Sequence, residues 1–402
     1  MIIGIDIGTS SAKICLLTEK REILQESHRN YSTHSSSLQD PKLILQVVLE
    51  LLHDVYTKNH RISEIFTCVK CSSLYNWMFD CPTEFLEILP KWKEAEIYPG
   101  FGMVTMAFLK NSEGAGFFEN FDKCGTIMDL FLAFLTKTSK NVKISHHNAF
   151  SWGYCSSAGK WQPEILQFLP ENIELPEIVL DQNQIFGFWN GAKCHVASGD
   201  LQASVAALEK VGEGTAYLII GTSAQLCLLH PISQDSKIPE NLAPTIVNLP
   251  FSPTHRLLAT CAMNGGNAIQ KIVEDFIAPG KSSLRETLDL LNSNSSDLLP
   301  GNLEISPIFI AERGSKKKLL KIPENIRDFE SLQILEAAHF GVVRNIFEMF
   351  FEVSENFRRL ALVGAAKEPR FIRQIRKLKP EIEIMKLDCE IEVSTPFGAT
   401  KF

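Results

Sequence analysis

The first 17 residues contain the feature that most constrains the fold of this chain: two short apolar stretches joined by a small polar turn. Ile2–Ile7 is crowded with β-branched residues, as in a strand that is buried on both faces. Gly8-Thr9-Ser10 then turns the chain, and Lys13–Leu17 is predicted to return as a second strand. These residues predict a β-hairpin inside a larger sheet.

The turn of this hairpin carries groups that suit phosphate binding. A glycine such as Gly8 lets backbone N–H groups approach an anion, and the side chains of Thr9, Ser10 and Lys13 add donors and positive charge. Asp6 precedes the turn, where a carboxylate can hold a hydrated Mg²⁺ against phosphate oxygens. An ordinary hairpin with a surface aspartate remains the alternative for these residues alone.

A second copy of this pattern lies about half the chain further on. Ala216–Ile220 is an apolar stretch, Gly221-Thr222-Ser223 is the turn, and Gln225–Leu229 returns. The two units resemble the phosphate-binding hairpins of the actin-like ATPases, in which two duplicated α/β domains close on one nucleotide. The sequence contains neither the Walker-type nor the dinucleotide-type glycine motif.

The composition fits a protein with two cores. A chain of 402 residues is long enough for two domains of about 200 residues each. A hydrophobic content of 45% and a charged content of 22% are those of a globular protein. The net charge of −7 argues against nucleic acid or an anionic membrane as the partner. No apolar run is long enough to span a bilayer. The first apolar stretch is short and is interrupted by Asp6, so it is not expected to be a signal peptide. A cytoplasmic protein is therefore expected.

The ten cysteines are scattered through apolar runs, as is typical of reduced, packed thiols. Cys68 and Cys71 form a C-x-x-C pair, but no second pair stands at zinc spacing. Packing is therefore favoured over a metal or redox role for this pair.

The rest of the chain predicts alternating helices and strands. Asp40 is expected to cap a helix that begins at Pro41 and carries one apolar face. Further strands are predicted near residues 65–70 and 360–364, and further helices near 102–110, 127–135, 200–208 and 330–351. Strand, strand, helix, strand is an α/β pattern with a mixed sheet. Residues 186–192 are expected to connect a domain of residues 1–190 to one of residues 191–402.

Two polar features are each open to two interpretations. The stretch Ile144–Tyr154 is dense in polar and aromatic side chains, as in a solvated loop with aromatic anchors or in a ligand-binding wall. Asp200 stands at the start of a predicted helix, where a carboxylate caps the helix and favours its dipole. In a cleft, the same carboxylate could accept a proton from an alcohol that attacks a phosphoryl group.

Taken together, the motifs resemble those of the FGGY carbohydrate kinases, and within them the sedoheptulokinases most closely. The resemblance covers most of the chain. Its residues are Gly4-x-Asp6-x-Gly8-Thr9-Ser10-x-x-Lys13, Gly102-Met-Val-Thr105, Gly125-Thr-Ile-x-Asp129, Asn148-Ala-Phe-Ser-Trp-Gly-Tyr154, Gly199-Asp-Leu-Gln-Ala-Ser-Val205, Asn264-Gly-Gly-Asn267 and Glu312-Arg313. It implies two ribonuclease H-like domains of the actin-like ATPase class with an interdomain cleft.

The resemblance also implies an activity and its residues. The reaction would be ATP-dependent phosphorylation of a ketose at its terminal hydroxyl, from sedoheptulose to sedoheptulose 7-phosphate, with Asp200 as the catalytic base and Asp6 positioning Mg²⁺. Residues implied to contact ATP are Gly8, Thr9, Ser10, Lys13, Gly221, Thr222, Ser223, Gly364 and Ala365. Residues implied near the sugar are Asn148, Gln202 and Tyr75. No nucleic-acid or membrane partner is implied, and no coiled-coil or interface stripe indicates the oligomeric state.

Several positions depart from the family pattern. After Cys71 the chain lacks the family's Gly-Gln-Met-His-Gly turn and a sugar-contacting insertion, and Tyr75 stands where the sugar-binding histidine would be. His146 replaces an aspartate, and the segment Gly364–Arg370 replaces the adenosine-loop pattern. Three alternatives therefore stay open: an active ketose kinase, a sugar- or nucleotide-binding protein with little turnover, and a different actin-like ATPase.

Overall fold

The computed structural model describes residues 1–31, 37–56, 61–69, 75, 78–208, 214–232, 242–279, 303–315, 320–351, 357–385 and 395–401. The chain divides into two compact units. The first comprises residues 1–210, 250–252 and 389–402, and the second comprises residues 211–249 and 253–388.

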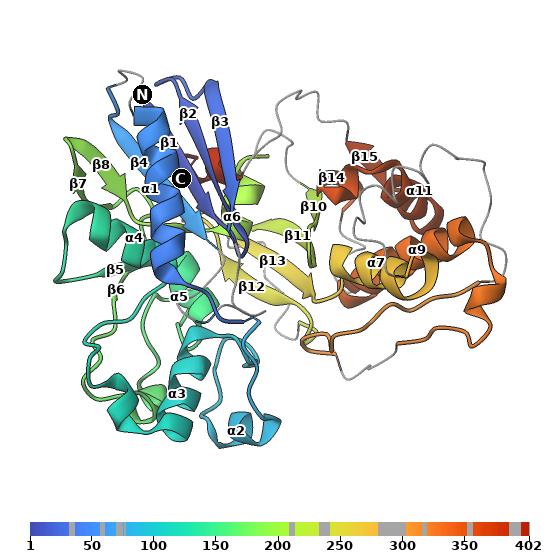
Figure 1. Cartoon of the computed structure of the whole chain (residues 1–402), viewed down its shortest axis with the longest axis horizontal. Coiled ribbons are helices and arrows are strands. Elements are labelled where there is room, and N and C mark those ends of the chain that lie inside the picture. The colour runs from blue at the N-terminus through green and yellow to red at the C-terminus, as the bar shows by residue number, and fades with distance from the viewer. Residues whose placement is uncertain are drawn as a thin grey trace. The chain divides into compact units, whose positions relative to one another are not determined.

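The sheet of the first unit is centred on the predicted hairpin (Figure 1). Its strands, in spatial order, are β3 (Ile23–Asn30), β2 (Ser11–Leu17), β1 (Ile2–Ile7), β4 (Glu64–Val69), β8 (Ala192–His195) and β7 (Ile185–Trp189). β1 pairs antiparallel with β2 and parallel with β4, and the short strand β9 (Ser198–Gly199) pairs with the end of β4. The predicted hairpin and mixed sheet are confirmed.

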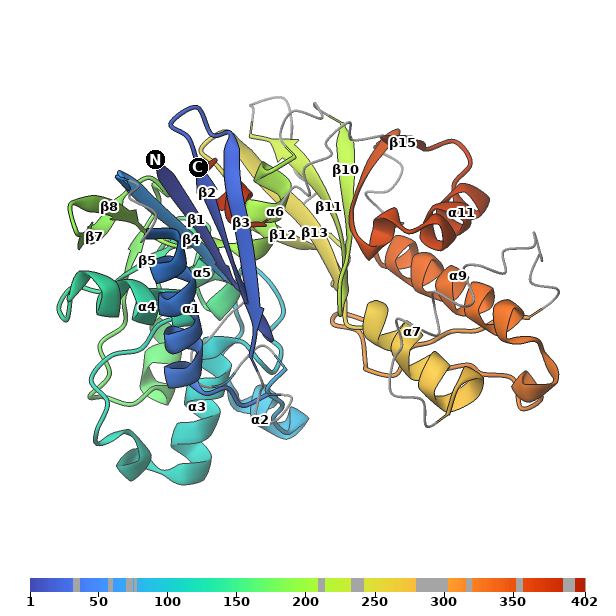
Figure 2. The ribbon, with the colours of Figure 1, turned by 45° about the horizontal axis from the view of Figure 1, so that its top comes forward.

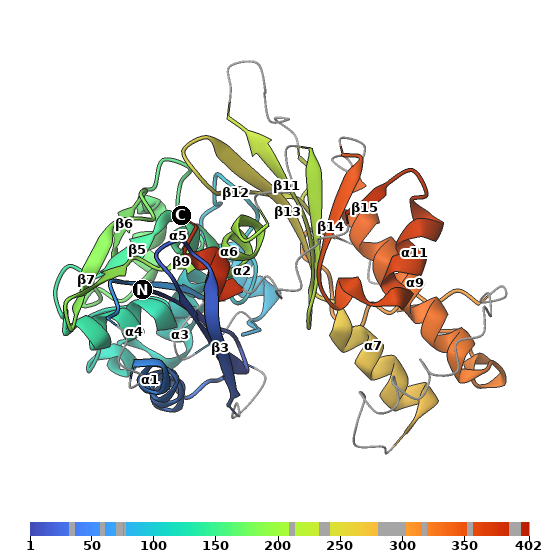
Figure 3. The ribbon, with the colours of Figure 1, turned by 90° about the horizontal axis from the view of Figure 1, so that it is seen from above.

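Both faces of β1 are buried, as its β-branched residues predict. Ile3, Ile5 and Ile7 are fully buried in a core that includes α1 (Pro41–Tyr56) and α4 (Ile127–Thr136). The opposite face packs against α12 (Thr395–Ala399), which also contacts α6 (Asp200–Ala206) (Figure 3). A Cβ atom at Gly4 would lie 2.1 Å from the Pro396 carbonyl oxygen, so this close approach requires glycine.

The remaining elements of the first unit include a small second sheet. They are α2 (Thr83–Ile88), α3 (Gly102–Glu113), η1 (Ala115–Phe118), β5 (Lys143–Ser145), α5 (His146–Trp152), η2 (Pro163–Phe168) and β6 (Glu177–Val179). β5 pairs parallel with β6. The predicted cap of α1 is confirmed, because the Lys42 backbone N–H donates to Asp40 Oδ1 at 2.9 Å.

The second unit repeats the central strand arrangement of the first. Its sheet runs β12 (Val247–Pro250), β13 (His255–Ala262), β11 (Ala224–Pro231), β10 (Thr215–Ile220), β14 (Arg359–Gly364) and β15 (Glu383–Met385). Its helices are α7 (Gly266–Ile272), η4 (Val273–Ile277), η5 (Ile326–Asp328), α9 (Ser331–Met349), η6 (Ala365–Lys367) and α11 (Pro369–Leu378) (Figure 2). β10 pairs antiparallel with β11 and parallel with β14, just as β1 pairs with β2 and β4. The second predicted hairpin is therefore confirmed.

Residues 186–192 form part of a hairpin within the first unit, so the expectation of a connection between domains is wrong for them. β7 and β8 are antiparallel, and the two residues between them, Asn190 and Gly191, have φ angles of 48° and 82°. Positive φ at both positions is the geometry of a tight hairpin turn. β8, β9 and α6 consequently lie in the first unit, although the sequence placed residues 191–210 in the second domain.

The described helices include none with the length and apolar composition needed to cross a membrane.

A buried carboxyl group at the start of α4 predicts a pH-dependent stability. Asp129 Oδ2 accepts hydrogen bonds from the Thr126 N–H at 2.7 Å and hydroxyl at 2.8 Å, whereas its buried Oδ1 has no partner among the described residues. Burial raises the pKa of Asp129 to about 7 from 3.8. Because the folded chain then holds a proton that the unfolded chain releases, stability should fall by a few kcal/mol, as an order of magnitude, as pH rises from about 4 to 7.

Urea denaturation of the wild type and of Asp129→Asn across this pH range measures the effect. The variant cannot titrate at this position, so the difference between the two curves should change with pH. A difference that is constant from pH 4 to 8 would contradict the prediction.

Candidate functional site

The carboxyl ends of three parallel strands bring two predicted site residues together in the first unit. Asp6 on β1 is paired with Cys68 on β4, and Cys68 is paired with Ser198 on β9. Adjacent strands are about 4.8 Å apart, so these residues lie side by side at one edge of the sheet. Asp200 follows β9 directly as the first residue of α6. The carboxyl ends of parallel strands are the usual binding edge of an α/β sheet.

Cys68 lies beside both carboxylates, a feature that the sequence analysis missed. Its Sγ is 3.7 Å from Asp6 Oδ1, 3.7 Å from the Thr395 carbonyl oxygen and 3.6 Å from the Ile5 carbonyl oxygen. Burial raises the pKa of the Cys68 thiol well above its usual value, and the charges of Asp6 and Asp200 raise it further. The thiol therefore stays protonated and can donate its S–H. Cys71, its partner in the C-x-x-C pair, is outside the described residues.

Two hydrogen bonds stabilise the turn after β1. The Gly8 N–H donates to the Ser11 carbonyl at 2.8 Å, which closes the turn, and Gln39 Nε2 donates to the Thr9 carbonyl at 2.7 Å. Ser10 and Lys13 are exposed.

Asp6 and Lys13 oppose each other in the β1–β2 ladder, and directly opposed side chains project from the same face of a sheet. The exposed ammonium group of Lys13 is thus on the same face as the Asp6 carboxylate.

The turn after β10 has a similar closure in the second unit. The Gly221 N–H donates to the Ser223 carbonyl at 2.9 Å, and Gly221 and Thr222 are exposed. The Gly266 N–H donates to the Gly221 carbonyl at 2.8 Å, and a Cβ atom at Gly265 would lie 2.4 Å from the Ser223 carbonyl carbon. The two glycines at the start of α7, Gly265 and Gly266, therefore allow direct backbone packing against this turn.

Glu312 and Asn264 support that glycine loop. Glu312 is buried, its Oε1 accepts from Nδ2 of Asn264 and of Asn345 at 2.7 Å each, and its Oε2 accepts from the Met263 N–H. Burial raises the pKa of Glu312, while these hydrogen bonds oppose the shift. The motifs Asn264–Asn267 and Glu312-Arg313 are thus joined by the hydrogen bonds of Glu312, and together they support the turn after β10.

The predicted adenosine segment adjoins the same turn. Gly364 is the last residue of β14 and is paired with Ile220, the last residue of β10. It has a φ of 62°, and a Cβ atom there would lie 2.5 Å from the Ile220 carbonyl oxygen. Ala365 begins the next turn. All the predicted nucleotide residues of the second unit therefore gather at the carboxyl ends of β10 and β14.

The residues implied near the sugar make hydrogen bonds and contacts within the first unit. Asn148 Nδ2 donates to the Ala197 carbonyl and Gln202 Nε2 donates to the Pro250 carbonyl, each at 3.1 Å, and both side chains are buried. Tyr75 forms a bridge with Leu38 and packs on Phe79, with ring centroids 5.0 Å apart. Contacts of these three side chains with a sugar stay a prediction.

The stretch Ile144–Tyr154 is not a solvated loop. Most of it forms α5, and His146, Phe150, Trp152 and Tyr154 are buried. His146 hydrogen-bonds through Nε2 to the Ser156 carbonyl at 3.0 Å. The solvated-loop alternative is therefore wrong, because the aromatic side chains form a packed layer.

Solved structures of carbohydrate kinases share the fold of this chain. A ligand-bound xylulose kinase from Lactobacillus acidophilus matches with a TM-score of 0.79 and 17% identity over 99% of this chain and 88% of that one. Gluconate kinase from Lactobacillus acidophilus matches with a TM-score of 0.78 and 17% identity, over 100% and 88%. Plasmodium falciparum glycerol kinase with ADP matches with a TM-score of 0.73 and 16% identity, over 100% and 88%.

No protein-family model matches the chain, and no curated protein matches its sequence. At these identities the structural likeness establishes the fold. The predicted α/β fold class with two ribonuclease H-like domains is confirmed.

Proposed function

We propose that this chain is an ATP-dependent carbohydrate kinase of the FGGY type that phosphorylates the terminal hydroxyl of a ketose. The observation that carries the proposal is the pair Asp6 and Asp200, which come together beside Cys68 at the carboxyl ends of parallel strands. The exposed Lys13, on the same face as Asp6, supplies a positive charge next to this pair. The fold shared with three kinases of different sugar and polyol substrates supports the same reaction class.

In this reaction the sugar hydroxyl oxygen attacks the γ-phosphorus of ATP, and the bond from that phosphorus to the bridging oxygen breaks to release ADP. Asp200 accepts the proton of the attacking hydroxyl. Its carboxylate is only partly buried, and Oδ1 accepts the Leu201 N–H at 2.8 Å, which orients the group at the start of α6. A partly exposed carboxylate in such a position suits a general base.

Mg²⁺ and ATP fit the residues that are present. Mg²⁺ needs one or two carboxylates together with phosphate oxygens and water, and Asp6 would hold it, where it would neutralise charge on the phosphates. The described residues contain no cluster of three or more metal-ligating side chains, which such a site does not require. The phosphates and nucleoside would be contacted by Gly8, Thr9, Ser10, Lys13, Gly221, Thr222, Ser223, Gly364 and Ala365.

We assign sedoheptulose as the sugar from the motif resemblance, with Asn148, Gln202 and Tyr75 near it. The experiment incubates the full chain with Mg·ATP and sedoheptulose, xylulose, ribulose, fructose, gluconate or glycerol and follows ADP release. Stimulation by sedoheptulose above the others is the expected result. Stimulation by another of these compounds but not by sedoheptulose would rule out the substrate assignment and leave the kinase assignment in place. If none of them stimulates ADP release, the kinase assignment is wrong.

A binding protein with little turnover is the second candidate. The observation that favours it is the engagement of the Asn148 and Gln202 amide donors with backbone carbonyls. Calorimetry separates the two candidates, because this second one predicts heat of binding for ATP or a sugar without sugar-dependent ADP release.

Cys68 provides a prediction about positioning within the proposed site. Cys68→Val removes the S–H that lies near Asp6, and we expect kcat to fall about three- to tenfold, as for the loss of a hydrogen bond of about 1 kcal/mol, with little change in KM for the sugar. Cys68→Ser keeps a donor and should recover part of the rate. Cys194→Val on β8, another buried cysteine, is the packing control and should keep the wild-type rate. Equal rates for Cys68→Val and this control would contradict a positioning role.

A further inference from the structure

Every carbonyl group of the first Gly-Thr-Ser turn accepts a hydrogen bond from the unit around it. The Tyr31 hydroxyl donates to the Gly8 carbonyl, and Gln39 Nε2 donates to the Thr9 carbonyl at 2.7 Å. The Tyr31 N–H donates to the Ser10 carbonyl at 2.9 Å. Two residues, Tyr31 and Gln39, therefore hold all three carbonyl oxygens of the turn.

Both of these residues are themselves fixed in the first unit. Tyr31 directly follows β3, is 8% exposed and packs in the core. Burial raises the pKa of its hydroxyl and the charge of Asp6 raises it further, so the hydroxyl stays protonated and can donate. Gln39 is 4% exposed and directly precedes Asp40, which caps α1. The core and the start of α1 thus determine the position of the turn.

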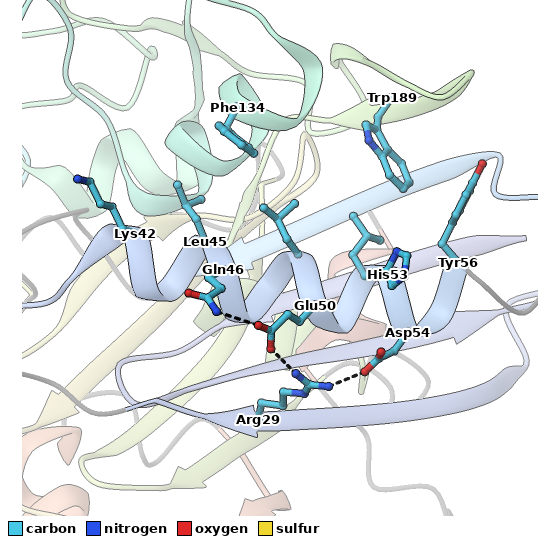
Figure 4. Close-up of a pocket in the computed structure, with 12 residues that line it drawn as sticks. Arg29, Lys42, Leu45, Gln46, Glu50, His53, Asp54, Tyr56, Phe134 and Trp189 are labelled. Atoms are coloured by element: carbon cyan, nitrogen blue, oxygen red, sulfur yellow. Dashed lines mark hydrogen bonds and ion pairs between the residues drawn. The ribbon is translucent and has the colours of Figure 1, made fainter.

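The two elements next to these residues, β3 and α1, are joined to each other. Arg29, near the end of β3, pairs with Glu50 of α1 and with Asp54 of α1, the latter at 2.6 Å (Figure 4). Because the three side chains are partly exposed, solvent screens these pairs and they add little stability. Their geometry nevertheless ties the strand before Tyr31 to the helix after Gln39.

The anchored carbonyl groups determine the direction of the N–H groups in the turn. In a trans peptide the C=O of one residue and the N–H of the next point in opposite directions. The hydrogen bond from Gln39 to the Thr9 carbonyl therefore directs the Ser10 N–H away from Gln39. Ser10 is exposed, and among the described residues no hydrogen bond takes up its N–H. An anion in front of the turn would meet this donor and not a carbonyl oxygen.

The second turn has the same arrangement with different donors. The Gly266 N–H donates to the Gly221 carbonyl at 2.8 Å, and the Asn267 N–H donates to the Thr222 carbonyl at 3.1 Å. The Ser223 carbonyl accepts the Gly221 N–H at 2.9 Å. Backbone groups at the start of α7 thus hold this turn, whereas two side chains and one backbone N–H hold the first. Engaged carbonyl groups are a feature that the two turns share although their donors are unrelated.

We propose that Tyr31 and Gln39 are positioning residues for the nucleotide, which fix the peptide groups of the first turn so that its N–H groups donate to the phosphates of ATP. This inference rests on the proposed kinase function. A carbonyl oxygen that turned toward the phosphates would place a partial negative charge against the anion, so a loosened turn would bind ATP more weakly. The effect should concern the phosphates alone, because the predicted adenosine segment belongs to the second unit.

Calorimetric titrations of the full chain with Mg·ATP and with adenosine test the proposal. Tyr31→Phe and Gln39→Met each remove one donor and nearly keep the size of the side chain. Each should weaken Mg·ATP binding about three- to tenfold, as for the loss of one hydrogen bond. Adenosine has no phosphates, so both variants should bind it as the wild type does. A merely structural role would instead weaken the binding of both ligands equally.

Two other buried side chains of the same unit provide matched controls. Tyr154→Phe removes a hydroxyl that donates to the Pro90 carbonyl at 2.7 Å, and Gln162→Met removes an amide that donates to the Lys91 carbonyl at 2.8 Å. These controls should lose stability as the turn variants do but keep the wild-type affinity for Mg·ATP.

The titrations distinguish failure of this inference from failure of the proposed function. Turn variants that bind Mg·ATP as tightly as the controls, or that lose affinity equally for Mg·ATP and adenosine, would overturn the positioning role and leave the kinase assignment in place. A wild-type chain that binds no Mg·ATP would overturn the proposed function, and this inference with it.

Discussion

Asp200→Asn is expected to lower sugar-dependent ADP release by about two to four orders of magnitude, because it removes the proposed acceptor of the hydroxyl proton. The amide oxygen of asparagine can still accept the Leu201 N–H, so the start of α6 should remain intact. The melting temperature and the affinity for Mg·ATP should therefore stay near their wild-type values. Steady-state kinetics with saturating sugar and ATP measure the loss in kcat.

Asp181→Asn is a matched control for that measurement. Asp181 is exposed, and its Oδ1 accepts the Asn183 N–H in a surface turn of the same unit. This variant should retain full activity. Near-normal turnover of Asp200→Asn would remove Asp200 from the mechanism, even if the chain proves to be a kinase.

Glu336→Gln is expected to lower the stability of the second unit by about 3–5 kcal/mol, because it removes one of the two charges of a buried ion pair. Glu336 on α9 accepts from Arg370 Nη1 at 2.6 Å and from Arg373 Nη2 at 2.5 Å, both on α11. The side chains of Glu336 and Arg370 are only 8% and 5% exposed. Hydrogen exchange of the α9 and α11 amides measures the loss within the second unit.

Arg373→Gln is the matched control for this ion pair. The Arg373 side chain is 47% exposed, so solvent screens its contact with Glu336 and the loss should be about 1 kcal/mol or less. Glu336 keeps its buried partner in this variant. Equal losses for Glu336→Gln and Arg373→Gln would show that burial does not determine the strength of the cluster.

The parts of the fold that the sequence predicted are those with strong local patterns. The run of isoleucines in β1 and the matching apolar stretch in β10 each precede a Gly-Thr-Ser turn, so both hairpins and their duplication could be inferred. The cap at Asp40 and the apolar face of α1 follow from equally local signals. These elements sufficed to predict the fold class.

The features that were missed depend on contacts between distant segments or on a signal that was overlooked. Asn190-Gly191 is a typical two-residue hairpin turn, and this pair could have revealed the β7–β8 hairpin. The pairing of β9 with β4, which brings Cys68 close to Asp200, joins residues about 130 positions apart and leaves no local pattern.

ATP is proposed to bind through both Gly-Thr-Ser turns, and calorimetric titration with Mg·ATP tests this. Ser10 and Thr222 are exposed turn residues, so Ser10→Asp and Thr222→Asp should fold normally and place a negative charge at each proposed phosphate contact. Each should weaken Mg·ATP binding by about tenfold or more, or 1.4 kcal/mol, while Ser157→Asp at an exposed position elsewhere should not. Wild-type affinity in either turn variant would contradict this binding mode.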